Sequence, residues 1–345
     1  MANSKANERA GRPVRMKDIA KELGLSVATI SKALSDAPDI SREMKLLVRK
    51  RCAELNYQPN SAARSLVTSK TMAVGLVVPD LLKSFFAEIA LGVARKLHPR
   101  GYTLVLSNSQ EDPKLERWEV EQLLARSVDG IILASSQPPH NRGVLRAIEE
   151  RKVPLVLLDR WFPHLRCDYI GADNFELGRM ATAHLIETGC RRVAHITCAR
   201  ISTAATRALG YRAALAQNGL HAAPELVVQA ANDAAGGHAA MLNLLNLSPT
   251  PDGVFCFNDG VAAGALKAIL EAGLKVPDDV AVIGAGNLLY TDFLRVPLST
   301  VDLGSGSMGE RAAELLLDRL SGKSEVPPRK LTVPLSLIVR DSTRR

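Results

Sequence analysis

Residues 17–36 read KDIAKELGLSVATISKALSD and contain two short amphipathic patterns separated by a turn. In the first pattern, Ile19 and Leu23 share a face, and Gly24 ends the predicted helix. Ser26 is a good N-cap for the second helix, because its hydroxyl can accept a hydrogen bond from a free amide of the first turn. Neither helix has enough apolar side chains for a core of its own. The question is therefore what surface the second helix contacts.

A third helical pattern, SREMKLLVRKRCAEL, follows at residues 41–55. We expect Leu46, Leu47, Cys52 and Leu55 to face inward and the basic side chains of the same segment to be exposed. Three helices of this kind, with the first two close together, predict a helix-turn-helix. In that motif the second helix enters the DNA major groove, and its neighbours contact phosphates. Any other small three-helix bundle would show the same apolar pattern. The distribution of charge therefore has to distinguish a helix-turn-helix from such a bundle.

The net charge of +8 is concentrated at the front of the chain. Residues 1–70 contain 14 Lys and Arg against 7 Asp and Glu, whereas the remaining 275 residues contain 30 against 29. Surface charge of this kind often does no more than keep a protein in solution. Because it is confined to the short helical module, it instead favours a polyanionic partner such as DNA.

Composition argues against several other classes of protein. The sequence has no run of about 18 apolar residues, so a membrane span is not expected. Its first residues, MANSKANERAGRPVR, are polar and basic and do not resemble a secretory signal, which favours a cytoplasmic protein with a disordered leader at 1–14. The five cysteines are odd in number and include no CxxC pair. We therefore expect reduced thiols, with neither disulfides nor a zinc site.

Catalysis finds little support in the sequence. Seven histidines are scattered, and neither an HExxH zinc motif nor a GxSxG nucleophile turn occurs. GSGSMG at residues 304–309 satisfies the dinucleotide pattern G-x-G-x-x-G and follows a strand-like LSTVDL. Too little chain follows it to build the rest of a nucleotide-binding half, so a helix start with turn glycines is preferred over an NAD-dependent enzyme. We expect no catalytic residue, no cofactor and no metal site.

From residue 73 onward, short β-rich runs alternate with helical stretches, as in AVGLVVPD at 73–80 and VPLVLLDR at 153–160. This alternation predicts an α/β fold with doubly wound parallel sheets. About eight such units exceed one comfortable open sheet, so we expect two lobes with a cleft between them. Ligands of open α/β sheets bind beyond the carboxyl ends of the strands. The polar residues expected at such ends are Asp80, Asp159, Arg160, Asn258 and Asp259.

Motifs along nearly the whole chain resemble those of one family. They are VRMKDIAKELGLSVATISKALSDAPDIS from Val14, ELNYQPNSAARSL from Glu54, DNFELG from Asp173, FNDGVAAGAL from Phe257 and VPDDVAVIG from Val276. On these residues the chain resembles the lactose-repressor (LacI/GalR) family of transcription regulators. The resemblance implies a helix-turn-helix head, a hinge helix and a two-lobed core like that of periplasmic binding proteins. It also implies a homodimer, with a tetramer as the alternative.

The resemblance also divides the chain into regions. We expect the head at 15–58, the hinge helix at 59–70, and an effector-binding and dimerisation core at 71–345. Lobe 1 would take about 71–170 and 302–329, and lobe 2 about 171–301 and 330–345, with crossovers near Gly171, Val301 and Lys330. The implied partners are a near-palindromic DNA operator and a small molecule in the cleft, a sugar or sugar acid, that changes the affinity for DNA.

The family match implies which residues meet DNA. Val27, Ala28 and Lys32 match the base-reading positions of the second helix. Lys32 could reach a guanine O6/N7 pair or a phosphate, whereas Val27 and Ala28 can offer only apolar contact. Leu66 matches the hinge leucine that wedges between base pairs in the minor groove, with burial in a core as the alternative. The other implied DNA contacts are Lys17, Ser26, Thr29, Ser31, Tyr57, Asn60, Ala63 and Arg64. For Tyr57, burial in the core is the alternative.

The implied effector site lies in the cleft. Arg207 in TRALGYRAAL is the strongest candidate in this site, because a charged donor just ahead of an apolar helical run usually has a functional or structural role. Gly286 in VIGAGNL departs from the family, which commonly places an aspartate there to accept ligand hydroxyls. Loss of that carboxylate beside Arg160 and Arg207 suits an anionic ligand such as a sugar acid or a phosphate. The implied contacts are Phe86, Asp159, Arg160, Trp161, Arg207, Asn258 and Asp259. For Trp161, packing at the edge of the lobe is the alternative to stacking on a sugar.

Two further functions remain open at this point. A transport-type sugar-binding protein would suit the core, but it would need a secretory signal and would have no use for a basic head. A DNA-binding regulator could also be switched by a partner protein on the surface of the core. Whether a ligand would release DNA or promote binding depends on which lobe geometry it favours.

Overall fold

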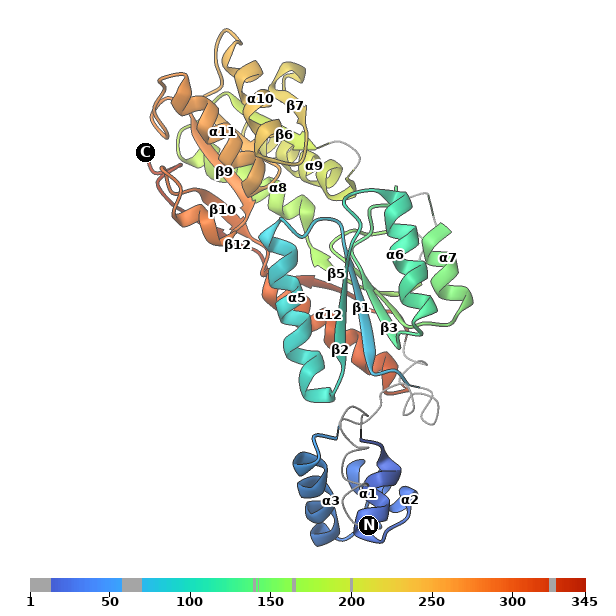
Figure 1. Cartoon of the computed structure of the whole chain (residues 1–345). Helices are drawn as coiled ribbons and strands as arrows, with labels where there is room; N and C mark the ends of the chain where they lie inside the picture. The colour runs from blue at the N-terminus through green and yellow to red at the C-terminus, as the bar shows by residue number, and fades with distance from the viewer. Residues whose placement is uncertain are drawn as a thin grey trace. The chain divides into compact units, whose positions relative to one another are not determined.

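The computed structural model describes residues 14–57, 70–138, 141, 143–162, 166–198, 201–322 and 327–345 (Figure 1). The chain divides into two compact units, one ending at Thr71 and one running from Met72 to Arg345. Nearly all of the predicted leader and of the predicted hinge helix lies outside the described residues.

The first unit is a bundle of three helices. These are α1 (Met16–Leu23), α2 (Val27–Leu34) and α3 (Arg42–Glu54). Gly24 ends α1 with a φ of 66°, a left-handed conformation that a residue without Cβ adopts easily. The Ser26 hydroxyl accepts a hydrogen bond from the Thr29 amide at 3.0 Å, and the Ser41 hydroxyl accepts one from the Met44 amide at 3.2 Å. Both serines therefore cap the helices that follow them.

The inward face of α3 differs from the prediction. Val48 and Cys52 are buried in the core of the head, whereas Leu46 and Leu47 are 58% and 47% exposed. An α-helix has about 3.6 residues per turn, so positions four apart share a face. The stripe that begins at Met44 continues through Val48 and Cys52 and leaves Leu46 and Leu47 outside. The prediction that these two leucines face inward is wrong.

The second unit begins with lobe 1, a six-stranded parallel sheet in the order β11-β5-β4-β3-β1-β2. Its strands are β1 (Ala73–Val78), β2 (Thr103–Asn108), β3 (Gly130–Leu133), β4 (Leu155–Leu158), β5 (Asp168–Ala172) and β11 (Lys330–Val333). Apolar side chains of α5 (Ser84–Leu97) and α12 (Ser305–Leu320) pack on one face, and those of α6 (Pro113–Ala125) and α7 (Gly143–Glu150) pack on the other.

Lobe 2 has the same architecture, with the strand order β12-β10-β9-β8-β6-β7. Its strands are β6 (Val193–Cys198), β7 (Val227–Ala230), β8 (Gly253–Cys256), β9 (Ala281–Gly286), β10 (Ser299–Asp302) and β12 (Ser336–Ile338), the last antiparallel to β10. Helices α8 (Asn174–Glu187) and α9 (Ser202–Gln217) pack on one face, and α10 (Ala234–Leu245) and α11 (Asp259–Glu271) on the other.

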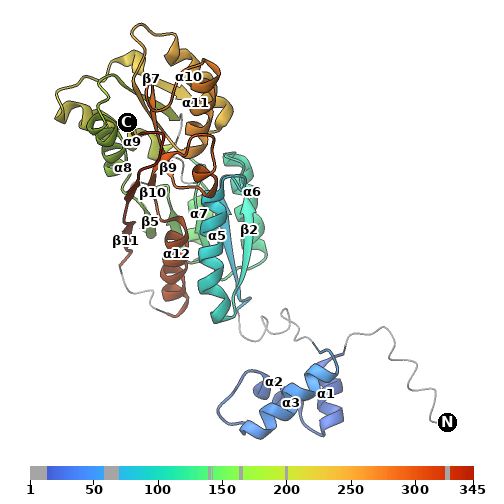
Figure 2. The ribbon, with the colours of Figure 1, turned by 90° about the vertical axis from the view of Figure 1, so that its left-hand side faces the viewer.

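The chain passes between the lobes after β5, after β10 and after β11. The third crossover lies later than predicted, because Lys330–Val333 pairs in parallel with β5 of lobe 1. Helices α5 and α12 lie side by side in both views (Figures 1 and 2). They approach so closely that a Cβ at Gly92 would lie 2.2 Å from the Gly306 carbonyl oxygen. Among the described residues, no helix is both long and apolar enough to cross a membrane.

Candidate functional site

The outer face of α2 carries the side chains that were expected to read bases. Val27, Ala28 and Lys32 are exposed, while Ile30 and Ala33 on the opposite side are completely buried in the core of the head. A helix that is anchored along one stripe presents a fixed outer face. This face can therefore be held against an external surface such as a DNA groove.

The remaining head residues differ in their surroundings. The Ser26 hydroxyl is already engaged, since it caps α2 and shares a 2.8 Å hydrogen bond with the Thr29 hydroxyl. Lys17 and Ser31 are exposed, and Tyr57 packs against the core of the head, where burial raises the pKa of its phenol. The predictions for Asn60, Ala63, Arg64 and Leu66 fall on residues outside the described ranges and stay predictions.

Two carboxylates follow α2 and contact basic side chains of the head. Lys32 Nζ lies 2.5 Å from Asp39 Oδ2. Asp36 Oδ1 lies 3.1 Å from Lys45 Nζ and 3.3 Å from Arg49 Nη2. The hydrogen bonds from these cations lower the pKa of both aspartates. Sequence reasoning missed this arrangement, although two acidic residues in the short segment SDAPD were a visible signal.

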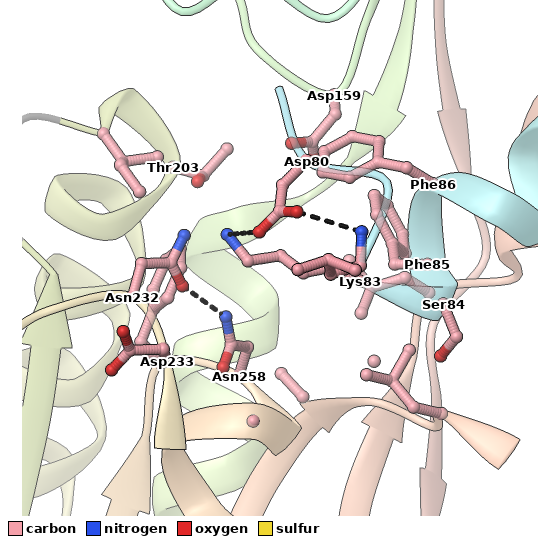
Figure 3. Close-up of a pocket in the computed structure, with 18 of the residues that line it drawn as sticks. Asp80, Lys83, Ser84, Phe85, Phe86, Asp159, Thr203, Asn232, Asp233 and Asn258 are labelled. Atoms are coloured by element: carbon pink, nitrogen blue, oxygen red, sulfur yellow. Dashed lines mark hydrogen bonds and ion pairs between the residues drawn. The ribbon is translucent and has the colours of Figure 1, made fainter. Parts of the chain in front are cut away.

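The second unit contains a cavity of about 380 Å³ where the carboxyl ends of the two sheets face each other (Figure 3). Lys83 points from lobe 1 toward Asn232 and Asn258 of lobe 2. The lobe 1 lining consists of Asp80, Leu82, Lys83, Ser84, Phe85, Phe86, Asp159 and Arg160. Most of the remaining lining comes from lobe 2 and includes Ile201, Thr203, Arg207, Asn232, Asp233, Phe257, Asn258, Gly260, Ala285, Gly286, Leu288 and Tyr290.

On the lobe 1 side, the cations of the cavity are neutralised by acidic partners. Arg160 donates to both carboxylate oxygens of Glu111 at 2.8 and 2.7 Å, and also to the Ser135 carbonyl at 3.0 Å. Lys83 Nζ lies 3.4 Å from Asp80 and 3.6 Å from Glu111. Burial would raise the pKa of Glu111, but the hydrogen bonds and charge of Arg160 outweigh it and hold the pKa below its usual value. Glu111 was not among the predicted residues.

On the lobe 2 side, Arg207 is 5% exposed and has a different environment. Its Nε donates to Asn174 Oδ1 at 2.8 Å and its Nη1 to the Phe257 carbonyl at 2.5 Å. The guanidinium lies 4.6 Å from the centre of the Phe257 ring. Among the described residues, no carboxylate forms an ion pair with it. Burial lowers the pKa of Arg207, so a ligand acceptor in the cavity would meet a poorly solvated positive charge.

Asp159 complements Arg207 from the other lobe. Its side chain is 7% exposed, and its backbone adopts a φ of 62° directly after β4. Within the described part of the chain, its carboxylate accepts no hydrogen bond. Burial raises the pKa of this carboxyl, against the lowering effect of Arg160 and Arg207. A donor on a bound molecule would therefore satisfy a group that the described residues leave unpaired.

Asp259 lies beneath the cavity rather than on its wall. It is completely buried, and it accepts hydrogen bonds from the Thr300 hydroxyl at 2.6 Å and the Leu288 amide at 2.9 Å. Burial raises its pKa to about 6. Gly286, next to it, has a φ of 139°, and a Cβ there would lie 3.0 Å from Asp259 Oδ2. The glycine is thus required by the backbone and by the space that Asp259 occupies.

The other predicted effector residues are divided between the cavity and its surroundings. Phe86 lines the cavity and packs edge-to-face on Phe85. Asn258 also lines it, but its Oδ1 caps α11 through the Val261 amide at 2.9 Å. Trp161 packs against Tyr169 and under the Lys330 ammonium, outside the lining that the structure describes.

The glycines of the motif GSGSMG have structural roles. Gly304 is the N-cap of α12, and a Cβ at Gly309 would lie 2.2 Å from the Ile89 carbonyl oxygen, so these glycines start and pack a helix. Across the described ranges, no three His, Cys, Asp or Glu side chains are grouped to hold a metal ion.

Comparison with known proteins adds two family matches. Residues 15–60 match the model of bacterial regulatory proteins of the lacI family, and residues 182–343 match a periplasmic binding protein-like domain. The chain is 31% identical over 334 residues to the HTH-type transcriptional repressor PurR of Haemophilus influenzae (strain PittEE), covering 95% of this chain and 98% of that protein. It is 32% identical over 328 residues to a ribose operon repressor of Haemophilus influenzae (strain ATCC 51907), with the same coverage.

Solved structures show the same likeness. A complex of the transcriptional regulator CelR with cellobiose is 31% identical in sequence, with a TM-score of 0.72. The match covers 96% of this chain and 100% of the CelR chain. The Lac repressor dimer bound to operator and the anti-inducer ONPF is 25% identical, with a TM-score of 0.85, and covers 96% of this chain and 99% of its own.

Proposed function

The chain belongs to the lacI family of bacterial regulatory proteins, and on that premise we propose that it is a repressor switched by a cavity ligand. In this proposal a dimer binds a near-palindromic operator through its two heads. A small molecule enters the cavity and changes the affinity for DNA. The observation that carries the switch is that Asp159 and Arg207, which have unpaired bonding capacity, come from different lobes.

A molecule that contacts both side chains has to bridge the lobes. Asp159 needs a donor, and Arg207 can serve an acceptor, so a hydroxyl-bearing ligand can satisfy the two at once. Its binding would favour the lobe geometry in which both contacts form. A ligand shifts an equilibrium only through its different affinity for the two states, which is what a bridging contact provides.

The charges of the cavity favour a neutral ligand over an acid. The three lining cations, Lys83, Arg160 and Arg207, are matched by the three lining carboxylates, Asp80, Asp159 and Asp233. Glu111 engages both Arg160 and Lys83, so Arg207 is left as the cation without an ion pair in the described lining. A sugar acid was predicted from two arginines, Arg160 and Arg207, of which only Arg207 is free of an ion pair in the described lining. We therefore propose a neutral sugar, in keeping with the cellobiose named for CelR.

The dimer would use exposed apolar side chains of both lobes. Leu82 is 96% exposed, Leu289 75% and Phe293 85%. The last two lie in or next to a short 3₁₀ helix, η4 (Leu289–Asp292). Burial of such side chains contributes roughly 25 cal/mol per Å² of apolar surface. In sedimentation experiments we expect Phe293→Glu to weaken the dimer, whereas a wild-type chain that sediments as a monomer would contradict this part of the proposal.

A thermal-shift panel tests the ligand. Full-length protein is melted with neutral sugars, sugar acids and nucleobases, and any stabilising compound is then added to an operator-binding assay. We expect a neutral sugar to raise the melting temperature and to change the affinity for DNA. Asp159→Asn should lose most of the shift, while Asp341→Asn, an exposed carboxylate elsewhere in the core, should keep it. Stabilisation by a compound that leaves DNA affinity unchanged would contradict the switch.

If no small molecule in the panel stabilises the chain, a protein on the surface of the core becomes the better candidate for the switch. A pull-down with the core as bait separates the two cases. Capture of a partner that changes operator affinity would then replace the cavity ligand in the proposal.

A further inference from the structure

The loop between α2 and α3 places a carboxylate against the outer face of α2. Lys32 lies one turn after Ala28 on that face, and its Nζ is 2.5 Å from Asp39 Oδ2. The side chains of both residues are about half exposed, at 56% and 53%. Asp39 therefore sits beside the surface that the proposed function directs toward DNA.

A second carboxylate of the same loop serves as a comparison within the chain. Asp36 contacts Lys45 and Arg49 of α3, and its main-chain oxygen also accepts a hydrogen bond from Lys45 at 3.1 Å. Asp36 thus engages two cations of the third helix, whereas Asp39 engages the one cation of α2. The two residues carry the same charge in the same loop but act on different elements.

We propose that Asp39 is a specificity-determining residue of the DNA-binding surface, which orients the Lys32 ammonium toward base edges and lowers affinity for DNA of random sequence. The inference depends on α2 being the helix that enters the major groove, as the proposed function has it. An ammonium has three N–H donors, so Lys32 can keep Asp39 and still donate to two acceptors such as guanine O6 and N7.

The penalty on random DNA follows from electrostatics. Sequence-independent binding is driven by cations that neutralise phosphates and release counterions. A carboxylate that holds Lys32 removes one of these cations from the backbone and repels the phosphates nearby. A matched operator replaces the lost phosphate contact with base contacts. Random DNA has no such replacement, so Asp39 weakens binding to random DNA more than binding to the operator.

The test compares full-length wild type, Asp39→Asn and the matched control Asp36→Asn. Each is titrated by fluorescence anisotropy with the duplex that wild type enriches from a random library, and with a random duplex, over a range of salt. For Asp39→Asn we expect binding to random duplex to tighten by about three- to ten-fold and its salt slope to steepen by up to about one phosphate equivalent. We expect the preference for the enriched duplex to fall.

Asp36→Asn should instead change the affinities for the enriched and the random duplex by the same factor, and so leave the preference intact. A double-mutant cycle gives a second readout, because in a Lys32→Ala background Asp39→Asn should no longer alter the preference. The inference would be overturned if Asp39→Asn changed the affinity for both duplexes equally, or if it altered the preference just as much in the Lys32→Ala background. Either result would leave the proposed function standing. If wild type enriches no duplex at all, the proposed function fails as well, and the two failures are distinguished.

Discussion

Asp259 should make the stability of the core depend on pH in a way that Asp259→Asn removes. The carboxyl is completely buried, and its pKa is raised from 3.8 to about 6, chiefly by burial. The folded chain thus binds this proton more tightly than the unfolded chain. The stabilising contribution is complete below the unfolded pKa of 3.8 and is lost as the pH rises through about 6.

The size of the effect follows from the shift. A difference of about two pKa units corresponds to about 3 kcal/mol, since each unit is worth about 1.4 kcal/mol. Asparagine imitates the protonated carboxyl: its oxygen can accept from the Leu288 amide and its NH₂ can donate to the Thr300 hydroxyl. We therefore expect wild type and Asp259→Asn to be similar in stability near pH 4, and wild type to be less stable by roughly 2–3 kcal/mol at pH 7.

Urea unfolding followed by tryptophan fluorescence measures this directly. Both tryptophans, Trp118 and Trp161, belong to the unit that begins at Met72, so the signal reports the core and not the head. The free energy of unfolding is compared for the two chains at half-unit steps from pH 4.0 to 7.5. A difference between them that stays constant over this range would refute the reasoning, because a group ionised in both states adds no pH dependence.

Three further substitutions test other contacts of the core. Glu111→Gln removes the bidentate carboxylate partner of Arg160, and the free energy of unfolding in urea should fall by roughly 2–3 kcal/mol. A much smaller fall would contradict the role of Glu111 as the ionic partner of Arg160. Gly286→Ala places a Cβ 3.0 Å from Asp259 at a φ of 139°, so it should lower the melting temperature more than Gly273→Ala, where a Cβ meets open space. The side chain of Asp168 is completely buried, and its carboxylate accepts hydrogen bonds from Arg319 at 2.8 Å. Asp168→Asn removes this charge and should lower the free energy of unfolding in urea by roughly 3–5 kcal/mol. A near-neutral effect would contradict this expectation.

Local signals explain why much of the fold could be predicted. Gly24 and the capping serines act within one turn of the chain, and the helix boundaries of the head follow from them. The alternation of β-rich and helical runs likewise reflects strands that are buried on both faces. Leu46 and Leu47 were predicted to be buried because they are apolar, and this was wrong. The buried face of α3 is instead the one that carries Val48 and Cys52, which lie four residues apart.

The candidate site was harder to predict, because its contacts join distant parts of the chain. Glu111 follows β2, yet it neutralises Arg160 after β4, and no local pattern links the two. Asp259 stands beside Asn258 at a strand end, but its carboxylate turns beneath the cavity toward Thr300. Arg207 and Asp159 were both expected at the cleft. That they come from opposite lobes and lack ionic partners among the described residues became visible only in three dimensions.

The most direct test is the affinity of the full-length chain for two duplexes, one enriched from a random library and one of random sequence, measured by anisotropy at physiological salt. We expect the enriched duplex to be two-fold symmetric and to bind at least about a thousand-fold more tightly. Enrichment of no symmetric sequence, with equal affinity for both duplexes, would contradict the assignment of this chain as an operator-binding repressor.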